Sequence, residues 1–372
     1  MEQTIVNTNV IQGKEIRAQR NSSVELLRIF AACAVVVLHY NGMGGALAAS
    51  KGITHELLLM LECLSVCAVD LFIMISGYFL CVTQKRTLDK PVYLLLLLWV
   101  INIIVYFIKS YVTGGGINPI TIAHIIIPPA NYFVVLYLAI YIVSPYINIV
   151  LDKLSDKGRT YMVIVLLLLF SVYPTLIDSY QLVMHHEFMG ISPVGAWGQQ
   201  HGYTIVGFSL CYVLGAWLRL NSFKWLKQNW RIICLIAIAI AGIYLWYKVE
   251  EYTVLGGASK LIEYNALSYS NPLVLLLTFL LLSLSLNIHF KSSFVNILAK
   301  STFVCYILHL SVVPFLRAGD FAARGGLAFW LHLVLSVLAI YIVSWIVWLV
   351  LDWLLRPIVK RLKNISLISQ YE

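Results

Sequence analysis

Two ionisable side chains inside the first long apolar stretch give the clearest chemical signal in this sequence. Arg28 and His39 lie eleven residues apart in S-V-E-L-L-R-I-F-A-A-C-A-V-V-V-L-H-Y. At about 100° per residue, eleven helical steps come within about 20° of three full turns, so both side chains face one stripe, about 16 Å apart along the axis. An arginine or histidine inside a membrane helix usually faces a polar interior or a water-filled cavity. The pair therefore indicates a helix that lines a functional cavity.

Two further polar positions lie in the second apolar stretch, V-D-L-F-I-M-I-S-G-Y-F-L. Asp70 falls near mid-membrane, either as a partner for Arg28 or His39, or as a buried carboxyl group capped by hydroxyls and kept for packing. Ser76 and Gly77 follow in the same stretch. Small residues let helix backbones approach closely in lipid, so this pair indicates either a helix contact or a functional surface.

A third polar stripe is predicted in the ninth apolar stretch, S-T-F-V-C-Y-I-L-H-L. Thr302, Tyr306 and His309 fall at i, i+4 and i+7, which is one face of an α-helix. This stripe lines the cavity or forms a hydrogen-bonded helix contact. In the first stretch, Glu25 precedes Arg28 by three residues and is expected to pair with it across one helical turn.

The elements that must position these groups are membrane-spanning helices. Hydrophobic residues make up 60% of the 372 residues and charged residues only 12%, which excludes an ordinary soluble domain. The apolar residues fall in ten blocks of roughly 18 to 25, long enough to cross about 30 Å of hydrocarbon. An all-α, polytopic membrane protein with ten transmembrane helices is therefore predicted. The predicted spans are 24–43, 57–82, 91–112, 131–151, 161–177, 203–220, 232–247, 272–288, 297–315 and 328–352. The run 120–129 is too short to span and ends in two prolines, so an interfacial or re-entrant segment is expected there.

Lysine and arginine predict the orientation of the ten spans. Alternate loops hold nineteen of these residues, and the opposite loops hold six. The side with more lysine and arginine is cytoplasmic, so both termini are expected in the cytoplasm. This asymmetry accounts for the net charge of +9 without a nucleic-acid partner. The predicted organisation is a cytoplasmic tail (1–23), one ten-helix membrane domain (24–355) and a basic cytoplasmic tail (356–372).

Neither cysteines nor histidines predict a metal centre. All seven cysteines lie in or at the edges of apolar stretches without a C-x-x-C pair, so no disulfide framework is expected. His185, His186 and Glu187, with His201, lie in a predicted outer loop. Adjacent histidines on an exposed loop seldom form a site, so no metal is expected.

Several separated motifs extend along nearly the whole chain. The first stretch contains an acidic-x-x-Arg-x10-His pattern at 25–39, and the second contains D-x-F-x-x-x-S-G-Y at 70–78. The others are N-Y-F-V-V-L-Y-L-A-I-Y-I-V-S-P (131–145), G-F-S-L-C-Y-V-L-G-A-W-L-R (207–219) and C-Y-I-L-H (305–309). In this order they resemble the acyltransferase type 3 family, bacterial integral-membrane enzymes with ten helices that acylate cell-surface sugars.

The resemblance implies transfer of an acyl group, acetyl in the first instance, from cytoplasmic acyl-CoA to a saccharide hydroxyl at the bacterial plasma membrane. As general base, His39 would take the proton of the acceptor hydroxyl. Arg28 would hold a phosphate or carbonyl oxygen of the donor, and Asp70 or Glu25 would orient or balance these groups. The donor-binding residues expected with Arg28 are Ser76, Arg86, Lys90, Tyr306 and His309. Where many family members carry Arg-x-x-Arg, this sequence reads R-T-L-D-K, which leaves Arg86 and Lys90 as basic candidates.

The acceptor is expected at the long outer loop 179–202. This loop is nearly free of lysine and arginine and contains aromatic and amide side chains, among them Tyr180, Trp197 and Gln199. Such groups suit a neutral sugar, and Trp197 is the predicted contact. The alternative is an ordinary belt of aromatic residues at the membrane interface.

Two other functional classes fit the same polar residues. A transporter or flippase would also keep polar groups at mid-membrane, and it would move substrate without consuming acyl-CoA. A scaffold for polysaccharide-synthesis machinery would need neither activity and would tolerate loss of His39. A homodimer is compatible with each of these functions.

Overall fold

The computed structural model describes residues 21–83, 85–127, 131–185, 203–254, 265–363 and 365, and these fold almost entirely into helices. The long helices are α1 (Ser22–Asn41), α3 (Gly52–Ser65), α4 (Ala68–Leu80), α5 (Asp89–Thr113), α7 (Tyr132–Lys153), α8 (Asp156–Leu167), α9 (Tyr173–His185), α10 (Ile205–Leu220), α11 (Asn229–Val254), α12 (Pro272–Asn287), α14 (Thr302–Val312) and α16 (Gly326–Lys360). The shorter elements are α2 (Ala46–Ala49), α6 (Pro119–Ile126), η1 (Leu168–Val172), η3 (Lys224–Lys227), η4 (Asn265–Leu267), α13 (Ser293–Leu298), η5 (Ala299–Ser301), η6 (Val313–Phe315) and α15 (Ala318–Arg324).

Within the described ranges, nine helical segments are long and apolar enough to cross a membrane. They overlap nine of the ten predicted spans, so the prediction of a polytopic, all-α membrane protein is confirmed. The remaining predicted span, 203–220, corresponds to α10, an apolar helix of only 16 residues. Four of the nine segments join two or more elements, for example α3 and α4 into Gly52–Leu80.

The short run at 120–129 agrees with its prediction, whereas the end of the last predicted span differs from the structure. The run 120–129 forms the eight-residue helix α6, which is too short to span, as predicted. The last helix, α16, continues for eight residues beyond the predicted end at position 352 and ends at Lys360. Arg356 and Lys360, which were predicted to lie in a C-terminal tail, therefore belong to this helix.

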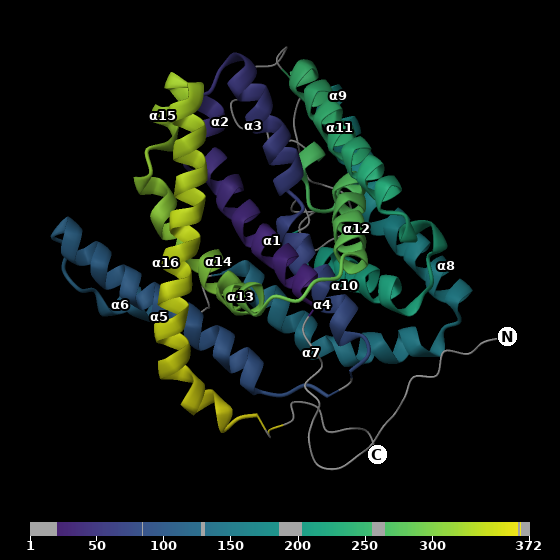
Figure 1. The fold of residues 1–372 in the computed structure, drawn as a ribbon, viewed down its shortest axis with the longest axis horizontal. Coiled ribbons are helices and arrows are strands. Elements are labelled where there is room, and N and C mark those ends of the chain that lie inside the picture. Colours follow the sequence, from purple (N-terminus) through teal and green to yellow (C-terminus); the bar gives the residue numbers. More distant parts are fainter. Residues whose placement is uncertain are drawn as a thin grey trace.

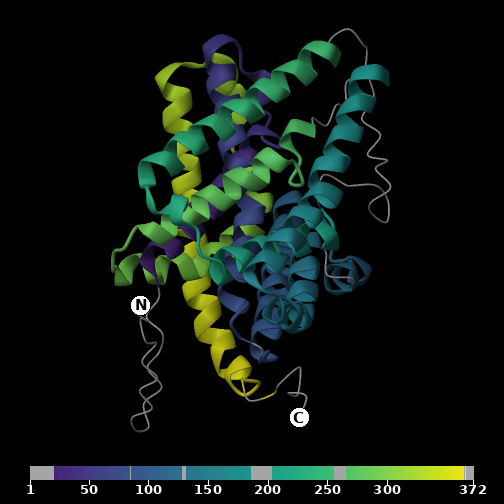
Figure 2. The same cartoon turned by 90° about the vertical axis from the view of Figure 1, so that its right-hand side faces the viewer.

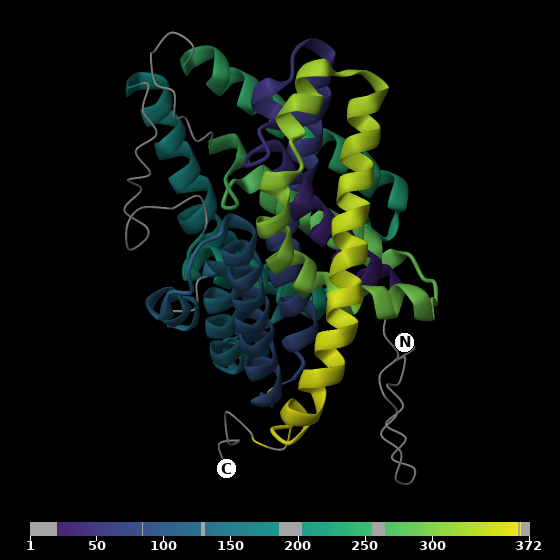
Figure 3. The same cartoon turned by 90° about the vertical axis from the view of Figure 1, so that its left-hand side faces the viewer.

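Helix α16 runs along the whole height of the bundle (Figures 1 and 3). It packs beside α14, which in turn contacts α1. Helices α5, α6 and α7 lie in the lower part of the view, whereas α9 and α11 reach its upper edge (Figures 1 and 2). The bundle therefore consists of helices that start and end at different levels.

The contact between α4 and α10 depends on two glycines. A Cβ atom at Gly77 would overlap the backbone carbonyl of Tyr212, and one at Gly215 would overlap that of Met74. The absence of a side chain at both positions lets the two helices approach at backbone distance. The prediction of a close helix contact at Gly77 is confirmed, and this contact fixes α4 beside the polar residues described next.

Candidate active site

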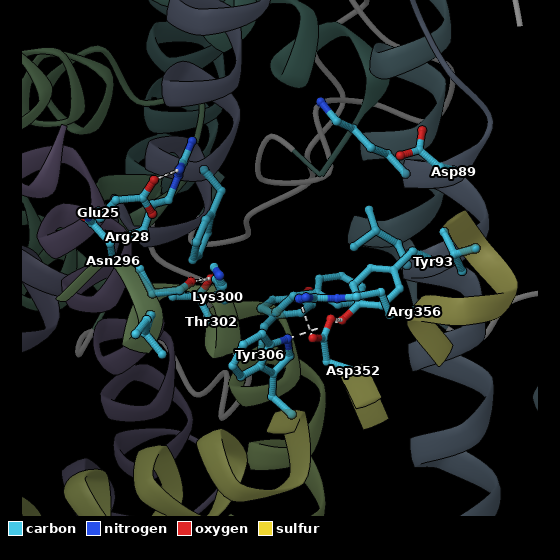
Figure 4. A pocket seen from close by; sticks show the side chains of 18 of the residues that line it. Glu25, Arg28, Asp89, Tyr93, Asn296, Lys300, Thr302, Tyr306, Asp352 and Arg356 are labelled. Atoms are coloured by element: carbon cyan, nitrogen blue, oxygen red, sulfur yellow. Dashed lines mark hydrogen bonds and ion pairs between the residues drawn. The ribbon is translucent and has the colours of Figure 1, made fainter. Parts of the chain in front are cut away.

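A cavity of about 1240 Å³ lies among α1, α4, α5, α7, α14 and α16. Its wall contains Arg28 from α1, Ser76 from α4 and Tyr306 from α14, as predicted for a helix interior lined by polar groups. Arg28 faces Tyr93 and Arg356 across the open space (Figure 4). Pockets for drug-sized ligands usually measure about 300–1,000 Å³, so this cavity has room for a larger, nucleotide-sized molecule.

The cavity carries an excess of positive charge. Among the described residues, six cationic side chains line it against three carboxylates. The cations are Arg28, Lys90, Lys300, Arg356, Lys360 and Lys363, and the carboxylates are Glu25, Asp89 and Asp352. A concave surface with one dominant sign of charge raises the local concentration of ligands of the opposite sign. The cavity is therefore suited to an anionic ligand.

Two ion pairs hold arginines of the cavity in place. Nη1 of Arg28 lies 2.8 Å from Oε1 of Glu25, one turn earlier on α1, which confirms the predicted pair. Nη2 of Arg356 lies 2.5 Å from Oδ2 of Asp352 on α16. The other oxygen of Asp352 accepts a hydrogen bond of 3.0 Å from the Tyr93 hydroxyl. Both guanidinium groups keep N–H donors beyond those in their ion pairs, since each carries five.

Aromatic rings separate this cavity from two histidines. Phe72, Phe133 and Tyr306 line the cavity, with ring centroids 6.2 Å apart for Phe72–Phe133 and 4.7 Å apart for Phe133–Tyr306. The Tyr306 ring lies 5.9 Å from that of His309, one turn further along α14. The ring of His39 lies 4.7 Å from that of His309 in an edge-to-face arrangement. Neither histidine lines the cavity. A single layer of aromatic side chains lies between the cavity and the His39–His309 pair.

The hydrogen bonds of the two histidines define the free nitrogen of each ring. Nδ1 of His39 lies 3.0 Å from the carbonyl oxygen of Val35, and Nδ1 of His309 lies 3.0 Å from that of Cys305. A carbonyl oxygen only accepts, so Nδ1 carries the hydrogen in both rings, and Nε2 of the neutral ring holds the lone pair. Nε2 of His309 is buried and has no hydrogen-bond partner among the described residues. Both imidazoles thus present a nitrogen that can accept a proton.

Asp70 lies elsewhere than predicted. The structure pairs Arg28 with Glu25, and it brings the Asp70 carboxyl group, on the first turn of α4, to the thiol of Cys211 on α10. Asp70 is buried and does not line the cavity. The predicted pairing of Asp70 with Arg28 or His39 is therefore replaced by a contact between α4 and α10.

Arg86 also lies away from the cavity wall. Its guanidinium group is 1% exposed and donates to the Ser144 hydroxyl at 2.7 and 2.9 Å and to the carbonyl oxygens of Leu80, Thr83 and Tyr141. These bonds tie the turn after α4 to the middle of α7. Arg86 therefore supports the fold rather than the donor site, whereas Lys90, the other basic candidate, does line the cavity.

The predicted acceptor contact, Trp197, lies outside the described residues, as do His186, Glu187 and His201. Sequence reasoning missed Lys300, Arg356, Lys360 and Lys363 as cavity residues. The only feature of the sequence that could have indicated them is that they belong to the basic segments predicted to be cytoplasmic. The same holds for Lys90, so five of the six cavity cations come from that one set of segments.

Comparison with known families agrees with the sequence motifs. A family model described as an acyltransferase domain matches residues 21–349. No curated protein and no solved structure gives a match to the chain. Because the match covers most of the chain, the protein belongs to the acyltransferase 3 family.

Proposed function

We propose that this member of the acyltransferase 3 family transfers an acyl group, acetyl in the simplest case, from acyl-CoA to a hydroxyl group of a cell-surface or lipid-linked sugar. The observation that carries the proposal is the cationic cavity of about 1240 Å³, which one layer of aromatic side chains separates from a pair of imidazoles. Acyl-CoA combines several phosphate charges with a long neutral arm that ends in a thioester. Its charged part suits the six cations, and its arm suits the aromatic part of the wall formed by Phe72, Phe133 and Tyr306.

The donor is proposed to enter from the cytoplasm. Five of the six cations belong to the set of lysines and arginines that the charge asymmetry predicts to lie on the cytoplasmic side. Lys90, Lys300 and Arg356 are the proposed phosphate contacts, because charge-assisted hydrogen bonds to phosphate are stronger than neutral ones. Trp348 offers an aromatic face in the same wall, close to Lys300, with Lys300 Nζ 5.9 Å from the ring centre.

The proposed chemistry uses His39 as general base. Nε2 of His39 takes the proton of the acceptor hydroxyl while that oxygen attacks the thioester carbonyl carbon. The new C–O ester bond forms as the C–S bond breaks, and the thiolate of CoA takes the proton back from the imidazolium. Arg28, held by Glu25, is proposed to neutralise charge on the donor. The buried imidazole of His309 lies beside His39 and presents the lone pair of its Nε2 atom rather than an N–H group that would compete for the His39 lone pair.

Release of CoA thiol tests this function directly. Membrane vesicles that retain the cell's own glycolipids are supplied with labelled acetyl-CoA, and both free thiol and labelled sugar are measured. Loss of a general base lowers the rate by about two to four powers of ten, so His39→Ala should lower transfer by that factor. The exposed histidine at position 289 gives a control, His289→Ala, with unchanged transfer. Transfer by His39→Ala at the wild-type rate would contradict the assignment.

The same vesicles distinguish the enzyme from a transporter or flippase. A transporter would move labelled sugar or acyl group across the membrane while the amount of acyl-CoA stays constant. Family membership favours the enzyme. Movement of label without thiol release would replace the proposed function with transport.

A further inference from the structure

Tyr306 lies close to three other tyrosines from different parts of the chain, Tyr132, Tyr203 and Tyr269. Of these four, Tyr306 lines the donor cavity and the other three do not. Rings of Tyr132 and Tyr203 are 4.8 Å apart, and rings of Tyr203 and Tyr269 are 4.6 Å apart, both edge to face. Hydroxyl groups interact in the pairs Tyr306–Tyr132, Tyr132–Tyr269 and Tyr269–Tyr203. Tyr306 also donates to the amide oxygen of Asn131 at 3.5 Å. We call these four side chains the tyrosine cluster.

The tyrosine cluster lies where three helices begin. Tyr132 is the first residue of α7, Tyr203 precedes α10 by two residues, and Tyr269 precedes α12 by three. The opposite ends of α7 and α10 carry the basic residues Lys153 and Arg219. The cluster thus faces the side of the protein opposite to the basic loops that supply the donor cavity.

Exposure falls along the cluster from the surface to the interior. Tyr132 and Tyr203 are 42% and 38% exposed, whereas Tyr269 is 8% and Tyr306 is 5% exposed. Tyr306 lines the donor cavity and also contacts the His309 ring. The cluster is therefore a continuous series of aromatic and hydroxyl groups from the surface to the junction of the cavity with the two histidines.

An interfacial belt does not account for this arrangement. Belt tyrosines sit singly at the level of the lipid headgroups, with the ring in the apolar layer and the hydroxyl toward water. Here the hydroxyl groups contact one another, and two of the four rings are buried inside the bundle. A packing core needs no hydroxyl groups, whereas each of these four phenols can both donate and accept a hydrogen bond.

We propose that the tyrosine cluster, with Asn131, is the acceptor site and binds a neutral sugar ring; this inference rests on the proposed acyl transfer. Tyrosine rings pack against the apolar C–H face of a pyranose, and phenol and amide groups hydrogen-bond its hydroxyls. The cluster side chains and Asn131 carry no formal charge. Because these residues offer no cation to pair with an anionic sugar, a neutral hexose or N-acetylhexosamine fits best.

Binding of simple sugars without donor tests the site separately from catalysis. The whole protein is placed in lipid nanodiscs, because common detergents contain sugar headgroups that would compete. Methyl β-glucopyranoside, methyl β-galactopyranoside and methyl N-acetyl-β-glucosaminide serve as probes, with saturation-transfer NMR as the readout. At least one probe should bind the wild-type protein, and Tyr203→Ala should weaken that binding about ten-fold, which is the scale of one aromatic contact with its buried area.

Two further variants make the result specific. Tyr203→Phe keeps the ring and removes the hydroxyl, so it should retain binding better than Tyr203→Ala. Tyr161→Ala removes a tyrosine that is 72% exposed on α8, and it should bind the probe like the wild type. Circular dichroism checks that each variant is folded, and calorimetry with acetyl-CoA should give the same donor affinity for all of them.

The possible failures point to different conclusions. No binding of any probe by the wild-type protein, or equal loss in Tyr203→Ala and Tyr161→Ala, would overturn the acceptor site. Absence of acetyl-CoA binding with normal sugar binding would instead overturn the proposed donor and leave the tyrosine cluster as a sugar site.

Discussion

Arg356 offers the sharpest test of the donor cavity. Its guanidinium group lines the cavity and is held by Asp352 at 2.5 Å, and its side chain is 62% exposed. Two unit charges 4 Å apart interact by about 1 kcal/mol in bulk water and about 4 kcal/mol at an effective dielectric constant of 20. Because more than half of this side chain is exposed, the value should lie near the lower limit, about 1–1.5 kcal/mol. Arg356→Gln should therefore weaken acetyl-CoA binding about five- to ten-fold.

The assay is calorimetry with two ligands at two salt concentrations. Acetyl-CoA carries the phosphates, whereas S-acetylpantetheine carries the same thioester and arm without the nucleotide. Arg356→Gln should lose affinity for the first ligand and keep that for the second, and its defect should shrink at high salt because screening weakens exposed charge pairs. Arg361→Gln is the matched control, since Arg361 lies five residues away and does not line the cavity. Equal losses for the two ligands, or equal losses in the two variants, would refute a phosphate contact at Arg356.

Three other predictions concern the framework. Arg86→Met should lower the free energy of unfolding by at least about 2 kcal/mol, because it leaves buried carbonyl groups without donors. Acetyl-CoA affinity should stay unchanged, and Lys85→Met, at an exposed neighbouring position, is the control. Gly215→Ala should destabilise the protein by about 1–3 kcal/mol through overpacking between α4 and α10, whereas Gly116→Ala, with open space around it, should not; unfolding in denaturing detergent measures both. In a variant without the seven native cysteines, single cysteines at Ser155 and Ser222 should react with an impermeant thiol reagent only after lysis, and one at Lys51 should react in intact cells. Labelling of position 155 in sealed cells would contradict the predicted orientation.

Local periodicity explains what could be predicted from the sequence. The Glu25–Arg28 pair spans one turn of one helix. Thr302 and Tyr306 line the cavity as helical spacing predicts, whereas His309, the third residue of that predicted stripe, does not. Such features depend only on the 3.6-residue repeat, so they need no knowledge of neighbouring helices. The apolar spans follow from length and composition for the same reason.

Tertiary contacts explain what could not be predicted. Arg86 and Lys90 are both basic residues just before the third predicted span, yet one is satisfied by the hydroxyl of Ser144 on α7 and the other lines the cavity. The sequence around Arg86 does not indicate that α7 will supply the oxygen atoms that accept its hydrogen bonds. Asp70 likewise faces Cys211 because α4 packs closely on α10, a contact between residues 141 positions apart in sequence.

Tyr306 is the point where the proposed donor and acceptor paths meet, and this favours direct transfer. It lines the donor cavity, its hydroxyl joins the tyrosine cluster, and its ring contacts that of His309. Donor and acceptor would approach the two imidazoles from opposite sides, so both can be bound at once and neither must leave before the other arrives. Steady-state rates measured against both substrates should then give intersecting double-reciprocal lines, because a ternary complex forms. Parallel lines, with labelled acetyl group retained on the protein before sugar is added, would instead establish an acyl-enzyme and make one of the two Nε2 atoms its carrier.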